Sequence, residues 1–158
     1  MNSKRVGAIL GVLVVLVITL YVFMTAPTHT TPLPVGGQSM LPTKKITIGR
    51  TEVTVEVATT LAQKSGGLSE RVSLSEGEGM LFVFDPPAID GFWMKDMRFS
   101  LDIIWADSQG TIVTIFQNLS PQTYPNVYKP SVPATYVLEV PAGFIEKHGV
   151  AIGDKIVL

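Results

Sequence analysis

Two apolar segments in the middle of this chain limit its possible folds more than any other feature. Residues 80–84, with the sequence Met-Leu-Phe-Val-Phe, are apolar at every position, which is typical of a strand covered on both faces. Residues 101–106 are also apolar, apart from one carboxylate, Asp102. Two such strands need apolar side chains on both sides of a sheet. We therefore expect a mainly β domain, a compact antiparallel β-sandwich or barrel-like fold.

The rest of the folded region shows shorter strand patterns and two short helices. Residues 45–48 and 52–57 alternate between polar and apolar side chains around a turn at Gly49, which predicts a hairpin with one solvent-exposed face. Pro86 and Pro87 are expected to stop the preceding apolar strand, because proline supplies no N–H to a sheet. The other expected elements are strands over residues 111–116, 136–140 and 155–158, a long irregular loop over 117–134, and helices over 61–64 and 144–148.

The N-terminal segment has the composition of a membrane anchor. Residues 6–24 contain no charged side chain, and as a helix they would span roughly 28 Å, close to the hydrocarbon thickness of a bilayer. A cleaved signal peptide is the alternative, but its apolar region is usually shorter, about 7–15 residues. Basic residues precede this segment only at Lys4 and Arg5, so the positive-inside bias places the N-terminus in the cytoplasm. We expect a single-pass protein of the cell membrane with a periplasmic or extracellular C-terminal domain.

Composition divides the chain into three parts and argues against several kinds of function. We expect the cytoplasmic tip and transmembrane helix in residues 1–24, a Thr-, Pro- and Gly-rich linker in 25–43, and the β domain in 44–158. The domain carries ten basic and thirteen acidic residues without a basic run, which argues against nucleic-acid binding. The chain has no cysteine, which excludes thiolate nucleophiles and Cys-ligated zinc. We predict no metal site and no cofactor.

Two carboxylates lie in strands that are otherwise apolar, Asp102 and Glu139. With Lys95 and Asp90 from the neighbouring loop, they could serve acid–base chemistry or a hard-cation site. The alternative is structural: Asp102 accepts backbone N–H groups or pairs with Lys95 to fix the loop, since structural ion pairs are commoner than active sites. By strand alternation, Asp102 faces away from Trp105.

Aromatic side chains supply further candidates for a binding site. Residues 92–94, with the sequence Phe-Trp-Met, either belong to the core or form a stacking platform around Trp93 for a sugar or a peptide. The loop 117–134 contributes Tyr124 and Tyr128, and a loop of this length in a small domain is often functional. We therefore add Trp93, Tyr124 and Tyr128 to the candidate ligand-binding residues.

Four blocks of this sequence, in the right order, resemble the DUF192 (UPF0127) family of small secreted or membrane-anchored domains. The blocks are residues 79–84, residues 92–95 followed by 101–104, residues 136–140 with Ala142-Gly143, and Gly153-Asp154. The resemblance covers about 110 residues, from the first hairpin to the end of the chain. It implies a compact, mainly β domain outside the cytoplasm, and it supplies no catalytic residues.

Two function classes follow from these observations. The first is a membrane-tethered binding or accessory domain, with a pocket between the loop 117–134 and the loop around Trp93 for a small-molecule, glycan or peptide ligand. The second is a hydrolase-type enzyme that uses Asp102 and Glu139. We favour the first, because no histidine lies in the strands and no activated nucleophile is evident. A purely structural envelope protein is a third alternative.

Overall fold

The structure is a computed structural model, and it describes residues 41–158. The predicted anchor, residues 6–24, and most of the predicted linker lie outside these residues. Within residues 41–158, no helix combines the length and the apolar composition that crossing a membrane requires. The elements in chain order are β1 (Thr43–Ile48), β2 (Thr51–Ala58), α2 (Leu61–Gly66), β3 (Glu78–Ala88), β4 (Leu101–Ala106), β5 (Ile112–Leu119), the 3-10 helix η1 (Pro121–Thr123), β6 (Ala134–Pro141), α3 (Phe144–His148) and β7 (Ile156–Val157).

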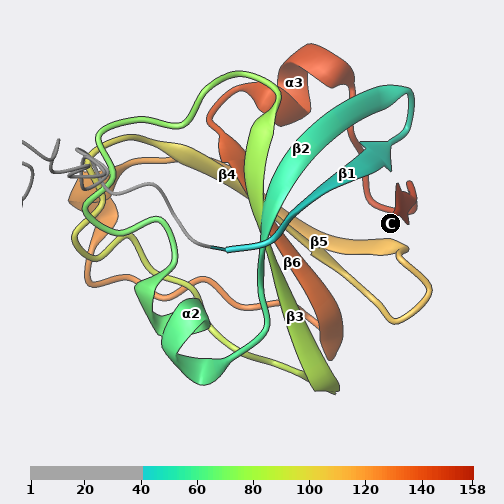
Figure 1. Ribbon diagram of the computed structural model, residues 1–158, viewed down its shortest axis with the longest axis horizontal. Helices are drawn as coiled ribbons and strands as arrows, with labels where there is room; N and C mark the ends of the chain where they lie inside the picture. The colour runs from blue at the N-terminus through green and yellow to red at the C-terminus, as the bar shows by residue number, and fades with distance from the viewer. Residues whose placement is uncertain (1–40) are drawn as a thin grey trace, which may run out of the picture. The chain divides into compact units, whose positions relative to one another are not determined.

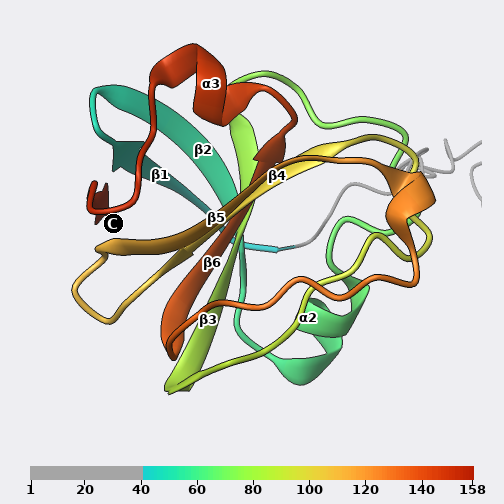
Figure 2. The ribbon, with the colours of Figure 1, turned by 180° about the vertical axis from the view of Figure 1, so that it is seen from behind.

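The seven strands form one sheet, in the order β5-β4-β6-β3-β2-β1-β7. The ends of this order approach each other, because Thr111 forms a β-bridge with Lys155 and the Ile156 N–H donates to the Gly110 carbonyl at 2.8 Å. The sheet therefore curls into a half-barrel, as Figures 1 and 2 show. The mainly β fold with two short helices is confirmed. Of the two predicted arrangements, the barrel-like one agrees with the structure and the sandwich does not, because the seven strands belong to one curved sheet.

The sheet is not wholly antiparallel, which corrects a second expectation. Strands β2 and β3 run parallel, whereas the other neighbouring strands are antiparallel. A parallel pair needs a connection that returns the chain to the end of the sheet where it started. Residues 59–77 provide this connection, and they carry α2 across one face of the sheet (Figure 1).

Each face of the sheet carries its own apolar core. The inner core contains residues from all seven strands and from α3, and its members are Ile46, Ile48, Val53, Val55, Leu81, Ile104, Ala106, Ile112, Leu138, Val140, Phe144, Ile145, Val150 and Ile156. The outer core lies on the opposite face, and its members are Ala58, Leu68, Met80, Phe82, Met94, Leu101, Ile103, Trp105, Leu119, Ala134 and Val137. Successive residues of β3 and β4 alternate between the two cores, which confirms that these strands are covered on both faces.

Two strands, β3 and β5, continue well past the C-terminal ends that the sequence predicts. Strand β3 continues through Pro86 and Pro87 to Ala88, but its regular pairing with β6 is interrupted between Val83 and Ala88. The prolines lie in that irregular stretch, where the missing N–H groups break no regular ladder. Strand β5 extends to Leu119, and part of the predicted loop 117–134 is therefore strand and 3-10 helix.

Helix α2 is short but well capped at its N-terminus. The Thr60 side chain accepts the Gln63 N–H at 3.3 Å, and the Gln63 side chain accepts the Thr60 N–H at 2.9 Å. This reciprocal capping box satisfies two N–H groups that the first turn would leave unpaired. Gly67 then ends the helix with a positive φ of 49°, a conformation that glycine adopts at little cost. The turn at Gly67 directs the chain toward the outer face of the sheet.

Candidate functional site

Glu139 lies near the middle of the sheet, on its outer face. Met80 of β3 and Ile103 of β4 are its partners in the neighbouring strands, so apolar residues flank it on both sides. The residue is 6% exposed, and no other residue in the described range 41–158 forms a hydrogen bond or ion pair with its side chain. Burial raises the pKa of Glu139 to about 8, and the positive charge of Arg71 partly opposes this rise. At pH 7 the Glu139 carboxyl is therefore mostly protonated.

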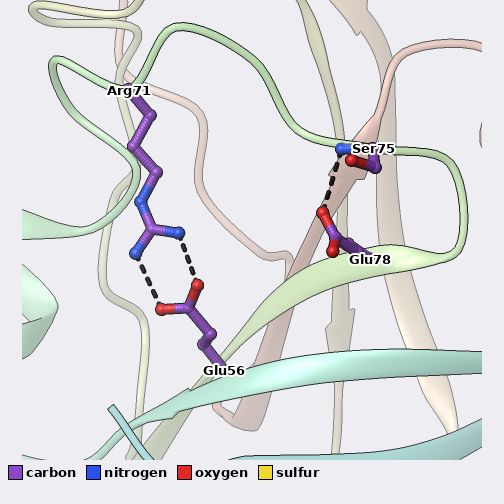
Figure 3. A network of polar contacts seen from close by, with 4 residues as sticks. All are labelled: Glu56, Arg71, Ser75 and Glu78. Atoms are coloured by element: carbon purple, nitrogen blue, oxygen red, sulfur yellow. Dashed lines mark hydrogen bonds and ion pairs between the residues drawn. The ribbon is translucent and has the colours of Figure 1, made fainter. Parts of the chain in front are cut away.

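Arg71 is the nearest strong cation to this carboxyl, but Glu56 already neutralises it. Arg71 lies in the loop after α2, and its two terminal nitrogens donate to the two carboxylate oxygens of Glu56 on β2 at 2.5 and 2.7 Å (Figure 3). Both side chains are half-buried. In the same loop the Ser75 N–H donates to Glu78 at 3.2 Å, which ties the loop to the start of β3. The bidentate pair fixes Arg71 on Glu56 and leaves Glu139 without a counter-ion of its own.

A cleft of about 300 Å³ opens over Glu139 on this face of the sheet. We call it the α2 cleft, because α2 and the turn after it form one wall. Strand β3 and the segment 90–97 form the rest, and β6 contributes Glu139. The lining residues are Leu61, Lys64, Ser65, Gly66, Gly67, Leu68, Ser69, Phe82, Phe84, Asp90, Gly91, Phe92, Trp93, Met97 and Glu139. The walls are therefore largely apolar and aromatic, with a few polar groups among them, which is the usual make-up of a small-molecule site.

Phe92 anchors the aromatic wall to the outer core. Its ring makes edge-on contacts with Phe82 and Trp105, at centroid distances of 4.9 and 5.7 Å. Its backbone exchanges two hydrogen bonds of 2.8 Å with Tyr128, which fixes this segment against the long loop. Trp93 points elsewhere: it is 55% exposed and lines the cleft. The core interpretation therefore holds for Phe92 and the buried Met94. Trp93 is exposed at the cleft, and its role as a stacking platform stays a prediction.

Three of the predicted site residues meet in the α2 cleft: Asp90, Trp93 and Glu139. Tyr124 lies beside them, with its exposed ring 6.3 Å from the Trp93 ring. Tyr128 packs instead on Phe116, at a centroid distance of 5.1 Å. The predicted pocket had the loop 117–134 as its second wall, whereas the cleft in the structure is formed with α2. That loop lies behind the lining, where Tyr124 contacts Trp93 and the Tyr128 backbone bonds Phe92.

Lys95 is exposed and lies apart from the cleft. Its amine is 3.9 Å from the Asp96 carboxylate, with both side chains largely in solvent. The predicted pairing of Lys95 with Asp102 is therefore wrong. An exposed pair of this kind contributes little to stability.

Asp102 has a structural role on the other face of the sheet. It is fully buried, and its two carboxylate oxygens accept the Asn118 N–H at 2.8 Å and the Ile145 N–H at 2.9 Å. These bonds tie β4 to the end of β5 and to the first turn of α3, and they confirm that Asp102 accepts backbone N–H groups. Asp102 is in register with Val140, the residue after Glu139, so the two carboxyls point to opposite faces of the sheet. They cannot act together on one substrate.

The sequence argument did not include Lys64, Phe82 or Phe84, which all line the cleft. Phe82 and Phe84 are two residues apart in β3, so the strand period places them on one face. That spacing was a usable signal. The position of Lys64 over Phe84, with its Nζ 4.2 Å from the ring centroid, depends on how α2 packs and could not be foreseen from spacing.

A second pocket, of about 170 Å³, lies beside α3. Its polar groups are already paired: Lys147 forms an ion pair with Glu76, which lowers the pKa of Glu76, and the His148 Nδ1 is 3.1 Å from the Thr51 hydroxyl. His148 lies in the last turn of α3, as predicted. In the described range 41–158, no three His, Asp or Glu side chains are arranged to hold a metal ion. The α2 cleft is thus the stronger candidate.

Comparisons with known proteins agree with this fold. The family model DUF192, described as "Uncharacterized ACR, COG1430", matches residues 44–158. A crystal structure from Sinorhizobium meliloti 1021, described as a "putative transcription regulator (R01717)", is 32% identical and has a TM-score of 0.72. The match covers 76% of this chain and 96% of that one. A protein of unknown function from Novosphingobium aromaticivorans DSM 12444 is 28% identical, with a TM-score of 0.73 and coverage of 81% and 94%. No curated protein matches the chain.

Proposed function

The chain belongs to the DUF192 family, whose description names no activity, and we propose that it is a binding domain that holds a small molecule in the α2 cleft. One observation carries this proposal. Glu139 is almost fully buried at the cleft, yet no side chain or backbone group among residues 41–158 bonds its carboxyl. Its oxygens keep some contact with solvent in the cleft, since the fully buried side-chain atoms without a partner in residues 41–158 are Trp105 Nε1 and Thr135 Oγ1. A carboxyl so nearly removed from water, with no protein partner, is still costly to the fold. A ligand that enters the cleft would supply that partner.

The surroundings of Glu139 support a binding role over a packing defect. Titratable groups with strongly shifted pKa values that lie in clefts are often functional, and Glu139 combines a raised pKa with a position at the cleft. Trp93, which lines the same cleft, leaves more than half of its surface exposed, although a large aromatic side chain is costly to leave in water. Burying Trp93 against a ligand would recover part of this cost. The site therefore pairs one unsatisfied hydrogen-bonding group with one unsatisfied apolar surface.

We propose that the domain is held at the outer surface of the cell membrane by residues 6–24. The support is in the sequence, where this segment has no charge and follows Lys4 and Arg5. The described domain begins at residue 41, and residues 25–40 would be the tether between the two. A binding domain in this place would capture its ligand outside the cytoplasm.

Two other functions have less support. A hydrolase that uses Asp102 and Glu139 conflicts with the geometry, since these carboxyls lie on opposite faces of the sheet and Asp102 is occupied by two backbone N–H groups. A role in transcription, the description printed for the Sinorhizobium protein, would need a basic surface on a DNA-binding domain. This chain has a net charge of −1, so we do not extend that role to it.

The test is to locate binding directly. The full chain, labelled with ¹⁵N in dodecyl maltoside micelles, is titrated with glucose, N-acetylglucosamine, the dipeptide Ala-Ala and choline. At least one probe should shift the amide signals of Gly67, Phe84 and Glu139, and Trp93→Ala should weaken its binding about tenfold through lost stacking. Ile152→Ala removes an equally exposed side chain outside the cleft and should change nothing. If none of the four probes moves the cleft signals, the proposed function is wrong.

A further inference from the structure

The α2 cleft also indicates what kind of ligand it takes. Resting on the binding function proposed above, we propose that the ligand carries an ammonium group, which lies on the aromatic wall of the cleft and is neutralised by Glu139. Three features lead to this class: the rings, an ammonium that the protein itself already places there, and the balance of charge.

The aromatic wall provides faces that attract cations. Phe82, Phe84, Phe92 and Trp93 line the cleft together, and the face of an aromatic ring carries partial negative charge that attracts an ammonium. Phe82 meets Phe92 edge-on, at an interplanar angle of 83°, and Phe84 meets Phe92 at 75°. Phe82 itself is only 1% exposed, so its ring supports Phe92 and does not meet a ligand. The rings that a ligand can reach are the partly exposed Phe84, over which Lys64 already lies, and Trp93.

Lys64 shows that an ammonium is favoured at this wall. It is half-buried in α2, and its Nζ lies 4.2 Å from the centroid of the Phe84 ring. Neither a hydrogen bond nor an ion pair to a carboxylate holds this amine within residues 41–158, so the ring is its partner. The protein's own cation therefore occupies the face that we assign to the ligand. Lys64 is attached to a short surface helix by a flexible side chain, and it can move into solvent when a ligand replaces it.

Charge in the cleft favours a cation over an anion. The titratable side chains of the lining are Lys64, Asp90 and Glu139. The nearby Arg71 is already neutralised by its ion pair with Glu56. Once Lys64 moves out, the remaining lining groups are two carboxyls. An anionic ligand would then face the negative charge of Asp90 and would gain no counter-charge from Glu139, which is mostly protonated at pH 7. An ammonium would instead pair with Glu139 in its ionised form, which removes the unpaired polar group at the cleft.

The alternative is a neutral ligand with a hydrogen-bond acceptor, to which protonated Glu139 would donate. Two molecules of nearly the same shape separate the cases: choline, and 3,3-dimethylbutan-1-ol, in which a carbon replaces the charged nitrogen. Both are titrated calorimetrically into the full chain in dodecyl maltoside, since detergents with choline headgroups would compete. An ammonium site should bind choline at least about tenfold more tightly than the alcohol. A site for neutral ligands should bind both alike.

Three variants assign the preference to the cleft. Glu139→Gln keeps the shape of the side chain but cannot ionise, and it should bring the two affinities within about threefold of each other. Glu146→Gln makes the same change on the exposed face of α3 and should leave the preference intact. Lys64→Gln removes the competing cation, so it should tighten choline binding several-fold without affecting the alcohol.

The outcomes separate this inference from the function on which it rests. If the alcohol binds as tightly as choline and both shift the cleft signals, the ammonium preference is overturned while the binding function stands. If choline binds more tightly but Glu139→Gln keeps the preference, Glu139 is not the counter-ion and the inference fails. If neither choline nor Ala-Ala, whose N-terminus is also an ammonium group, binds, the inference fails as well. Only the additional failure of the two sugar probes would remove the binding function itself.

Discussion

Replacing Asp102 by Ala should destabilise the domain by about 2–4 kcal/mol, because it leaves two backbone N–H groups without an acceptor. One is the Ile145 N–H, in a fully buried bond at the start of α3; the other is the Asn118 N–H, in a partly buried one at the end of β5. Each unpaired buried donor costs about 1–3 kcal/mol, and water can reach the second more easily than the first. Asp102→Asn should recover only part of the loss, since an amide offers one acceptor oxygen where the carboxylate offers two.

Asp107 provides a matched control for this experiment. Its Oδ1 also accepts two backbone N–H groups, from Gln109 and Thr111, both at 2.8 Å, but in a turn at the surface. Asp107→Ala should cost only about 1 kcal/mol, since water replaces the lost acceptor. Urea unfolding of a fragment of residues 41–158 measures these differences, and hydrogen exchange of the Ile145 and Asn118 amides locates them. An unfolding midpoint for Asp102→Ala equal to that of the parent or of Asp107→Ala would refute the structural role.

Three further predictions concern the anchor, metals and the cleft. The full chain should stay with membranes after a carbonate wash, while the fragment of residues 41–158 stays in solution; a secreted form that begins near Pro27 would instead show a cleaved signal peptide. EDTA should not change the melting temperature of the fragment, and a fall of several degrees that calcium restores would contradict this. For Glu139 the folded pKa of about 8 exceeds its ordinary value of 4.5, so the folded state binds the extra proton and the free energy of unfolding falls as the pH rises between these values. The fall is about 3 kcal/mol by pH 7 and up to about 5 kcal/mol above pH 8. Glu139→Gln should abolish this slope, and parallel pH profiles for variant and parent in urea unfolding would count against it.

The strands of this domain follow from local patterns that are visible in the sequence. The alternating residues 45–48 and 52–57 form the hairpin of β1 and β2, and the apolar segments form β3 and β4. The alternation that put Asp102 opposite Trp105 also holds, because a strand has a strict period of two. What could not be read locally is the parallel pairing of β2 with β3. It depends on where the crossover of residues 59–77 packs, which is a tertiary property.

The site was predictable only in part, for a similar reason. Glu139 and Trp93 stand out in the sequence as a carboxylate in an apolar strand and an aromatic residue in a loop, and the structure brings them to one cleft. Pairing Glu139 with Asp102 failed because the register between β4 and β6 sets Asp102 opposite Val140. A shift of one residue there would have put both carboxyls on one face. Nor could the sequence show that Arg71 forms its ion pair with Glu56. That pair leaves the Glu139 carboxyl without a counter-ion.

The most direct test of this account is the titration of the Glu139 carboxyl, followed by ¹³C NMR in the free protein and in the presence of saturating choline. Glu139→Gln identifies the signal by removing it. The account predicts a midpoint near pH 8 in the free protein, which falls by about one pH unit with choline if the ligand prefers the ionised carboxyl tenfold. A midpoint near 4.5 in the free protein, or one that choline does not lower, would contradict the account.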